Sequence, residues 1–333
     1  MSTFDDAHRR IRALHGRGAD APLGGEAVAD YAAVTARHRK LYWSVPGPLL
    51  FDTVDAHARF GRALLGARAS AELRSRLAVA AAESLLLAGR IAFFDLQAPA
   101  AAGEHLLGAL DAAEVAGDNA LAAAILAHRA FIPAFAGRAE EARGLVQAAR
   151  DRGGRSLSGV QSGWMHAVSA EVEAKFGAGV TAMDLLARAA DDLTADAEPC
   201  PEWLDYFDAA RHEAFTGYCA RVAGFPERAE AALTRSLESL PPTADKQRTV
   251  VHADLAAVLL ADRRIDECVA QLHEGLSIME QQWYAIALRR IKALRIGLTP
   301  HRRLPEVAHL DERLHALTRA RAASATAGQP AVP

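Results

Sequence analysis

Apolar residues recur every three or four positions along most of the chain, which is the spacing of one face of an α-helix. The clearest example runs from Trp203 to Pro242, where two such segments meet at a short corner around Gly224. Pro241 follows the second segment, and a proline at that place ends a helix. No segment alternates apolar and polar residues, so we expect essentially no β-sheet. The pattern predicts an all-α protein in which this region is an antiparallel pair of helices.

Small residues mark the places where the two helices of this pair approach each other. Gly217 lies in the first helix and Ala229 in the second, and Leu233 is large enough to fill the adjacent space. A single pair cannot bury its apolar face alone, so similar units are expected beside it. The same spacing recurs from four further anchor residues, which are Ala102, Ala142, Ala182 and Cys268.

The five anchors are separated by 40, 40, 47 and 39 residues. This period is typical of a tetratricopeptide repeat (TPR) with lengthened helices or loops. The single spacing of 47 indicates an insertion around Ala195 to Pro201. In three units the residue at the corner, five positions before the anchor, is a glycine: Gly137, Gly177 and Gly224. We therefore predict a right-handed α-solenoid of about five degenerate TPR-like hairpins. An irregular all-α bundle is the alternative.

The segments on either side lack the repeat and are predicted to cap the ends of the solenoid. The predicted divisions are N-terminal capping helices in 1–70 (a short helix up to Arg17, then about Glu26 to Trp43 and Leu49 to Leu65), repeats in 71–280, C-terminal capping helices in 281–320 (about Gln281 to Leu298 and Leu304 to Ala320) and a disordered tail in 321–333.

Composition excludes several classes of protein. The chain has 333 residues, 51% of them hydrophobic, so it can bury a large core, and its net charge of −3 gives no general reason to bind nucleic acid or an anionic membrane. Charged residues interrupt the most apolar region, Leu77 to Gly103, which we interpret as a buried hairpin. Three widely spaced cysteines and the absence of an apolar N-terminal run favour a cytoplasmic protein without direct DNA or membrane binding.

Several stretches resemble the TPR region of bacterial transcriptional regulators. They are Leu85 to Gln97, Trp203 to Arg211, Lys246 to Leu260 and Trp283 to Leu314. In that family a TPR half follows an N-terminal helix-turn-helix domain, and many members are linked to secondary metabolism and development. The resemblance covers roughly Glu26 to Leu314, and the residues before it are too few for such a domain. It therefore implies a sensor or partner-binding half without the DNA-binding domain.

TPR stacks bind partners in a concave groove that is lined by the first helix of each hairpin. The positions expected there are mostly apolar or aromatic, and they lack the Lys/Asn pattern with which chaperone-binding TPRs hold a carboxylate. We expect a protein or peptide segment, or an apolar small molecule, in the groove and no cofactor, with a homodimer as an open alternative. The predicted groove residues are Ser84, Leu87, Ile91, Phe94, His128, Phe131, Trp164, Glu171, Arg211 and Tyr218.

These observations predict a recognition module that acts in regulation, of gene expression or specialised metabolism, through a partner. The alternative is a solenoid that serves as an enzyme of a biosynthetic pathway, with His128, His166, Glu171 and Arg211 as acid–base or anchoring residues. His252 could also approach the first two histidines across the groove. No His or Cys pair has the spacing of a helical metal site, so no metal is predicted.

Two local clusters have structural interpretations. Trp203, Tyr206 and Phe207 are predicted to share a face in the first turn of a helix, with Asp208 paired to Arg211, although the lip of the groove is an alternative place for them. The basic run that includes Arg289, Arg290, Lys292, Arg295, Arg302 and Arg303 is predicted to be a solvated helix face.

Overall fold

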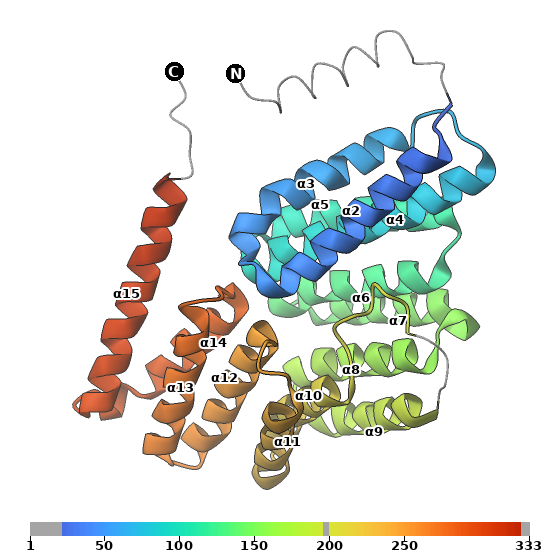
Figure 1. The fold of residues 1–333 in the computed structure, drawn as a ribbon. Coiled ribbons are helices and arrows are strands. Elements are labelled where there is room, and N and C mark those ends of the chain that lie inside the picture. The colour runs from blue at the N-terminus through green and yellow to red at the C-terminus, as the bar shows by residue number, and fades with distance from the viewer. Residues whose placement is uncertain (1–21, 196–199, 328–333) are drawn as a thin grey trace.

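The computed structural model describes residues 22–195 and 200–327, and its helices carry the labels of Figure 1. Within these residues the chain forms 14 α-helices and no β-strand, so the predicted all-α solenoid is confirmed. Ten of the helices make five consecutive hairpins. These are α4 (Ala71–Arg90) with α5 (Pro99–Ala116), α6 (Asn119–Phe135) with α7 (Ala139–Gly153), α8 (Gly159–Lys175) with α9 (Gly179–Ala195), α10 (Ala209–Val222) with α11 (Pro226–Ser239), and α12 (Asp245–Ala261) with α13 (Ile265–Met279).

The anchor residues lie where the two helices of a hairpin are closest. All five have no exposed surface. A Cβ atom added to Gly217 would lie 3.1 Å from the carbonyl oxygen of Ala229, and one added to Gly89 would lie 3.4 Å from that of Ala102. The small residues therefore permit the close helix contact that the sequence pattern predicts.

The corner between the two helices has the same backbone conformation in every hairpin. The residue five positions before each anchor has a positive φ, in the left-handed region that favours glycine. Glycine occupies three of these corners, and the other two carry side chains: Gln97 with φ 55° and Arg263 with φ 60°. The geometry is thus a property of the repeat, and two of the five corners adopt it against the preference of their residue.

Replacing Arg263 by glycine is expected to raise the free energy of unfolding by about 1 kcal/mol, because a side chain in the left-handed region costs roughly 1–2 kcal/mol. Urea unfolding followed by circular dichroism would measure the change. Gln97→Gly should raise the free energy of unfolding by less, since it removes the hydrogen bond of 3.0 Å that the Gln97 amide donates to the Phe93 carbonyl. A loss of stability in Arg263→Gly would show that this corner is not strained.

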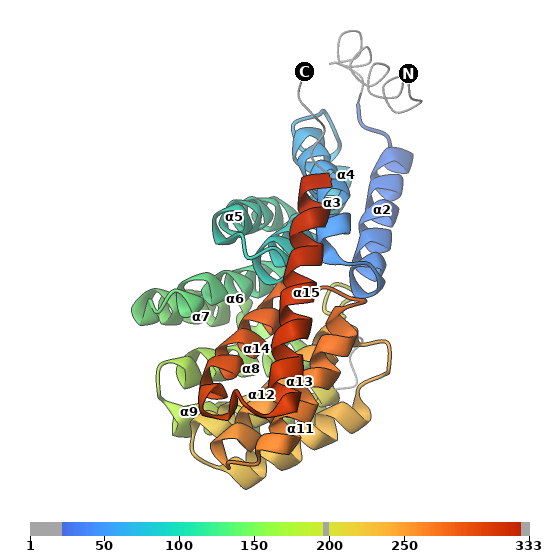
Figure 2. The ribbon, with the colours of Figure 1, turned by 90° about the vertical axis from the view of Figure 1, so that its left-hand side faces the viewer.

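The helices outside the hairpins differ from the predictions mainly at their ends. At the N-terminal end, α2 (Gly25–Ser44) and α3 (Gly47–Leu64) pack against α4 (Figure 1). At the other end, α14 (Ala285–Gly297) begins four residues later than predicted, because the chain turns through residues 281–284 first. The last helix, α15 (Pro305–Ala327), packs its first turns against α13 and continues past the predicted end at Ala320 (Figure 2).

The predicted short helix before Arg17 and the last six residues lie outside the described part of the chain. Ser70 and Asp118 cap the N-termini of α4 and α6, since their side chains accept hydrogen bonds from the backbone N–H groups of Leu73 and Leu121.

The first helix of the first hairpin is lengthened by a π-helical turn, Ile91–Asp95. Together the two segments, Ala71–Asp95, make a helix long and apolar enough to cross a membrane, but 83% of its most apolar window is buried inside the solenoid. Such burial is expected of a core helix. The π-turn matters for the site, because it carries Phe94 and Asp95 at the inner side of the stack.

Candidate binding cavity

The concave side of the solenoid is hollowed into a partly open cavity of about 80 Å³, which has room for several water molecules. The first helices of all five hairpins contribute to its wall, and so do α2, α14 and the loop before α10. The lining residues are Tyr42, Trp43, Arg90, Phe94, His128, Phe131, Phe135, Trp164, Glu171, Tyr206, Arg211, Phe215, Lys246, Gln247, Val250, Tyr284, Ile286 and Arg290.

An ion pair between the first and the fifth hairpin closes the cavity on one side. The Lys246 ammonium donates to Asp95 at 2.7 Å, and both side chains are buried. Tyr42 also donates to Asp95 at 3.1 Å, and the Trp283 indole donates to the Asp95 backbone carbonyl at 3.2 Å. Burial lowers the pKa of Lys246 to about 8 and raises the pKa of Asp95, while each charge favours the ionised form of the other. The solenoid is therefore curved enough for its two ends to touch.

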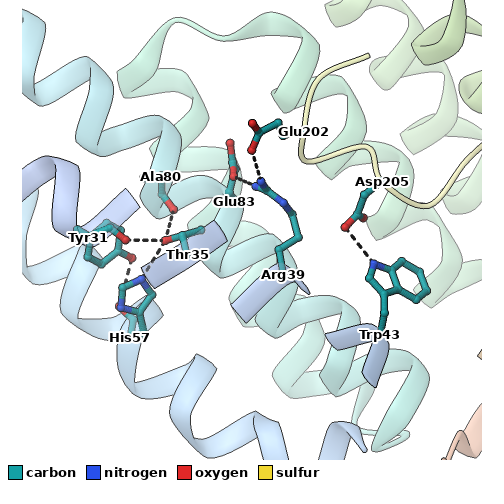
Figure 3. A network of polar contacts seen from close by, with 9 residues as sticks. All are labelled: Tyr31, Thr35, Arg39, Trp43, His57, Ala80, Glu83, Glu202 and Asp205. Atoms are coloured by element: carbon teal, nitrogen blue, oxygen red, sulfur yellow. Dashed lines mark hydrogen bonds and ion pairs between the residues drawn. The ribbon is translucent and has the colours of Figure 1, made fainter. Parts of the chain in front are cut away.

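The described part of the inserted loop, residues 200–208, crosses the cavity from α10 towards α2. Figure 3 shows its two links to α2: Arg39 donates to Glu202 at 2.8 Å, and the Trp43 indole donates to Asp205 at 3.0 Å. Arg39 is held in turn by Glu83 of α4. The loop thus ties the fourth hairpin to the N-terminal helices.

The prediction that Trp203 to Arg211 forms the start of a helix is wrong. Helix α10 begins at Ala209, and Asp208 is its N-cap, accepting from the Arg211 backbone N–H at 2.8 Å. The aromatic residues before it are buried in the loop instead, where they meet the concave wall. Tyr206 lies in the cavity, so the alternative interpretation, the lip of the groove, describes it better.

Aromatic rings contribute much of the cavity wall. The imidazole of His128 lies 4.9 Å from the Trp164 ring and 5.4 Å from the Tyr206 ring, and the Trp164 and Tyr206 rings are also 5.4 Å apart. Phe94 and Phe131 continue this surface at 5.6 Å from each other. These rings provide a suitable surface for an apolar or aromatic group.

Charged side chains also line the cavity or lie beside it. Arg290 of α14 is paired with Asp254 and lies 3.8 Å from Glu171, which also pairs with Lys175 at 3.5 Å. Tyr218 lies beside this group, in a small pocket that shares Glu171, Arg211 and Arg290 with the main cavity. The interior is therefore more polar than the predicted groove, because helices far apart in the sequence place their charges in it.

Six of the ten predicted groove residues line the cavity: Phe94, His128, Phe131, Trp164, Glu171 and Arg211. Tyr218 lies next to it. The remaining three do not line it. Ser84 is buried and hydrogen-bonded to the Tyr31 hydroxyl at 2.9 Å, and Leu87 and Ile91 belong to the core between α4 and its neighbours. Helices α2 and α3 cover that part of α4, so its expected groove positions face protein.

Several lining residues that the sequence did not reveal come from the first and fifth hairpins, from α14 and from α2. Arg90, Lys246 and Arg290 line the cavity together with Tyr42 and Trp43 of α2. Arg290 belongs to the basic run that was predicted to be solvated, and Arg295 of the same run pairs with Asp311. That prediction is therefore wrong for these two side chains. No local pattern identifies them, because their partners are distant in the sequence.

The histidines of the enzyme hypothesis do not converge. The ring of His166 pairs with Asp192 at 2.8 Å and that of His252 with Gln271 at 2.8 Å, both towards the second helix of their own hairpin. His128 alone of the three lines the cavity. In the described residues no group of three or more His, Cys, Asp or Glu side chains could hold a metal ion. Of the four residues of the enzyme hypothesis, His128, Glu171 and Arg211 line the cavity, whereas His166 does not.

Stability is expected to fall as the pH drops below about 6.5. Burial lowers the pKa of His57 to about 4, and burial together with the charge of Arg90 lowers the pKa of His128 to about 3. Unfolded histidines have a pKa near 6.5, so below that pH the unfolded chain binds more protons than the folded one. For His128 the loss between pH 7 and pH 4.5 is about 2.5 kcal/mol.

Urea unfolding at pH 7 and pH 4.5 would measure this loss. In His128→Gln the free energy of unfolding should differ less between the two pH values, by an amount comparable to this loss. An unchanged difference would show that His128 is protonated in the folded protein.

Comparison with known proteins supports the fold. No protein-family model matches the chain, and no curated protein matches its sequence. Solved structures do match. One is NprR in complex with its cognate peptide NprX, with a TM-score of 0.54, 13% identity, and coverage of 99% of this chain and 90% of that one. Another is a Rap protein complexed with competence and sporulation factor, with a TM-score of 0.54, 12% identity, and coverage of 90% of this chain and 99% of that one. At this identity the similarity shows a shared helical-repeat fold.

Proposed function

We propose that this chain is a regulatory module that binds a short peptide in the central cavity. One observation carries the proposal: the first helix of every hairpin contributes side chains to the wall of one cavity, and many of these side chains are aromatic. Concave surfaces of this kind are common recognition sites in helical repeats. The two similar structures, of NprR and of a Rap protein, contain peptides, which adds support from proteins of the same fold.

The inserted loop suggests how binding would be signalled. Tyr206 occupies the space beside Trp164 and His128, and the same loop holds Arg39 and Trp43 of α2. A peptide that displaced Tyr206 would also loosen these links to α2. Binding would then favour a second arrangement of the N-terminal helices, and a partner protein could recognise it.

The resemblance to the TPR half of transcriptional regulators suggests the process in which such a module acts. The proposed output is control of gene expression or specialised metabolism, exercised in the cytoplasm through a separate partner. In this proposal the chain contributes the recognition step and no chemistry of its own.

Native mass spectrometry of the protein after incubation with the peptide fraction of a host culture would test the binding step. We expect a retained peptide with the wild type and none with Val250→Trp, which fills the cavity from α12. Val180→Trp is the matched control, since Val180 is 69% exposed on α9, and it should retain the peptide.

Tyr206→Ala keeps the test decisive even if Val250→Trp fails to fold. Removal of this ring vacates part of the cavity, so the variant should bind the same peptide at least as tightly as the wild type. A peptide that binds the Val250→Trp protein, verified as folded by circular dichroism, as well as the wild type would place its site elsewhere and refute the proposal.

A further inference from the structure

Arg90 is a buried cation without an anionic partner. It is the last residue of α4, it is 7% exposed, and it lines the cavity. Its guanidinium carbon lies 4.1 Å from the Tyr206 ring centre, 5.0 Å from that of Tyr42 and 5.7 Å from that of Trp43. Among the described residues its side chain makes no ion pair and no hydrogen bond. The rings stabilise the charge, but they leave its N–H donors without acceptors.

Two other cations at the cavity are neutralised by carboxylates. Lys246 is paired with Asp95, and Arg290 is paired with Asp254. Asp205 influences Arg90 electrostatically, but its carboxylate accepts from the Trp43 indole and forms no ion pair with Arg90. Arg90 therefore has no carboxylate partner among the described residues of the cavity.

Arg211 is a second lining cation without an anionic partner in the described residues, although its side chain is only partly buried. Its guanidinium lies 5.1 Å from the Phe215 ring centre, and its side chain has no ion pair or hydrogen bond within the described residues. Both arginines line the cavity, and both act on the Tyr284 phenol. Burial and the charge of Asp95 raise the pKa of that phenol, whereas the charges of Arg211 and Arg90 lower it. The two guanidinium groups thus belong to the lining of one cavity.

We infer that this cavity is a binding site for a carboxylate attached to an apolar or aromatic group, with Arg90 and Arg211 as its anion ligands. A carboxylate accepts two hydrogen bonds from a guanidinium, and such charge-assisted bonds are the strongest of their kind. The apolar part of the ligand packs on the rings of Phe94, Phe131 and Trp164. This inference rests on the proposed function, since it names the group that the cavity selects. The carboxylate comes either from the C-terminal residue of a peptide or from a free carboxylic acid.

Matched probes distinguish the carboxylate from its apolar body. N-acetylphenylalanine and N-acetylphenylalanine amide differ only in the carboxylate and represent a peptide C-terminus. Phenylacetate and phenylacetamide are the corresponding pair for a free acid. Isothermal titration at millimolar probe concentrations should show that the acid of at least one pair binds the wild type about tenfold to a hundredfold more tightly than its amide.

The arginine variants test the ligands. Arg90→Met should remove the preference for the acid, and Arg90→Lys should retain only part of it, because an ammonium lacks the planar pair of donors. Arg211→Met should reduce the preference in the same direction. Arg59→Met is the matched control, since Arg59 is 69% exposed on α3, and it should leave the preference unchanged. Circular dichroism establishes that each variant is folded.

The outcomes separate this inference from the proposed function. Equal binding of acids and amides, a preference that survives Arg90→Met, or no binding of any probe would overturn the carboxylate site. A host peptide that binds equally well with an amidated C-terminus and lacks acidic side chains would do the same and would leave the peptide function intact. Preference for phenylacetate without any bound peptide would support the carboxylate site and contradict the peptide function.

Discussion

Replacing Lys246 by methionine is expected to lower the free energy of unfolding by about 3–5 kcal/mol, because the change leaves the Asp95 carboxylate buried without its counter-charge. The two side chains are 2% and 0% exposed, and their contact joins residues 151 positions apart. Tyr42 is the other side chain that donates to this carboxylate in the described chain. Urea unfolding at pH 7 would measure the loss.

Two variants show whether the loss comes from the buried charge. In Asp95→Asn/Lys246→Met both charges are absent, so most of the stability should return. Arg138→Met breaks an exposed pair with Glu141, whose side chains are 55% and 50% exposed, and should cost less than about 1 kcal/mol. A Lys246→Met protein no less stable than the Arg138→Met protein would mean that the contact between the two ends contributes little to the fold.

Gly217→Ala is expected to lower the free energy of unfolding by about 2–3 kcal/mol, because the added methyl group overpacks the fourth hairpin. Its Cβ would lie 2.4 Å from Cγ of Leu233 and 3.1 Å from the Ala229 carbonyl oxygen. The leucine can move only by disturbing the core, and the carbonyl belongs to the backbone of α11. Thermal and urea unfolding of the variant would measure the loss.

The same exchange at Gly144 is the control. Gly144 lies inside α7 with nothing within 4 Å of an added Cβ, so Gly144→Ala should raise the stability by about 0.5–1 kcal/mol through its helix propensity. If Gly217→Ala lowers the stability and Gly144→Ala raises it, the packing around each glycine decides the effect of the added methyl group. If both variants were stabilised, the close contact of α10 with α11 would be adaptable.

Contacts within a hairpin were predictable from the sequence because they are local. Gly217 and Ala229 belong to one hairpin, so the spacing of small and large residues records how its two helices pack. The corners extend this rule: the left-handed backbone occurs at Gln97 and Arg263 as well as at the predicted glycines. Helix caps such as Ser70 were predictable for the same reason, since the bond spans three residues.

The interior of the cavity was predictable only in part. The positions on the first helix of each hairpin indicated Phe131 and Trp164 correctly, because helical periodicity sets which face they occupy. The same rule was wrong for Ser84, where α2 covers the helix and supplies Tyr31 as a partner. It could not reveal Arg90, whose surroundings come from α2 and from the inserted loop.

The sequence by itself determined the helices, the hairpins, their number and the place of the insertion, because each depends on residues a few positions apart. Only the tertiary structure decided that the solenoid closes on itself. Curvature accumulates from small rotations between successive hairpins, and no local pattern records their sum. That sum brings Asp95 to Lys246, places Tyr206 against Arg90, and leaves two arginines in the cavity without carboxylate partners in the described chain.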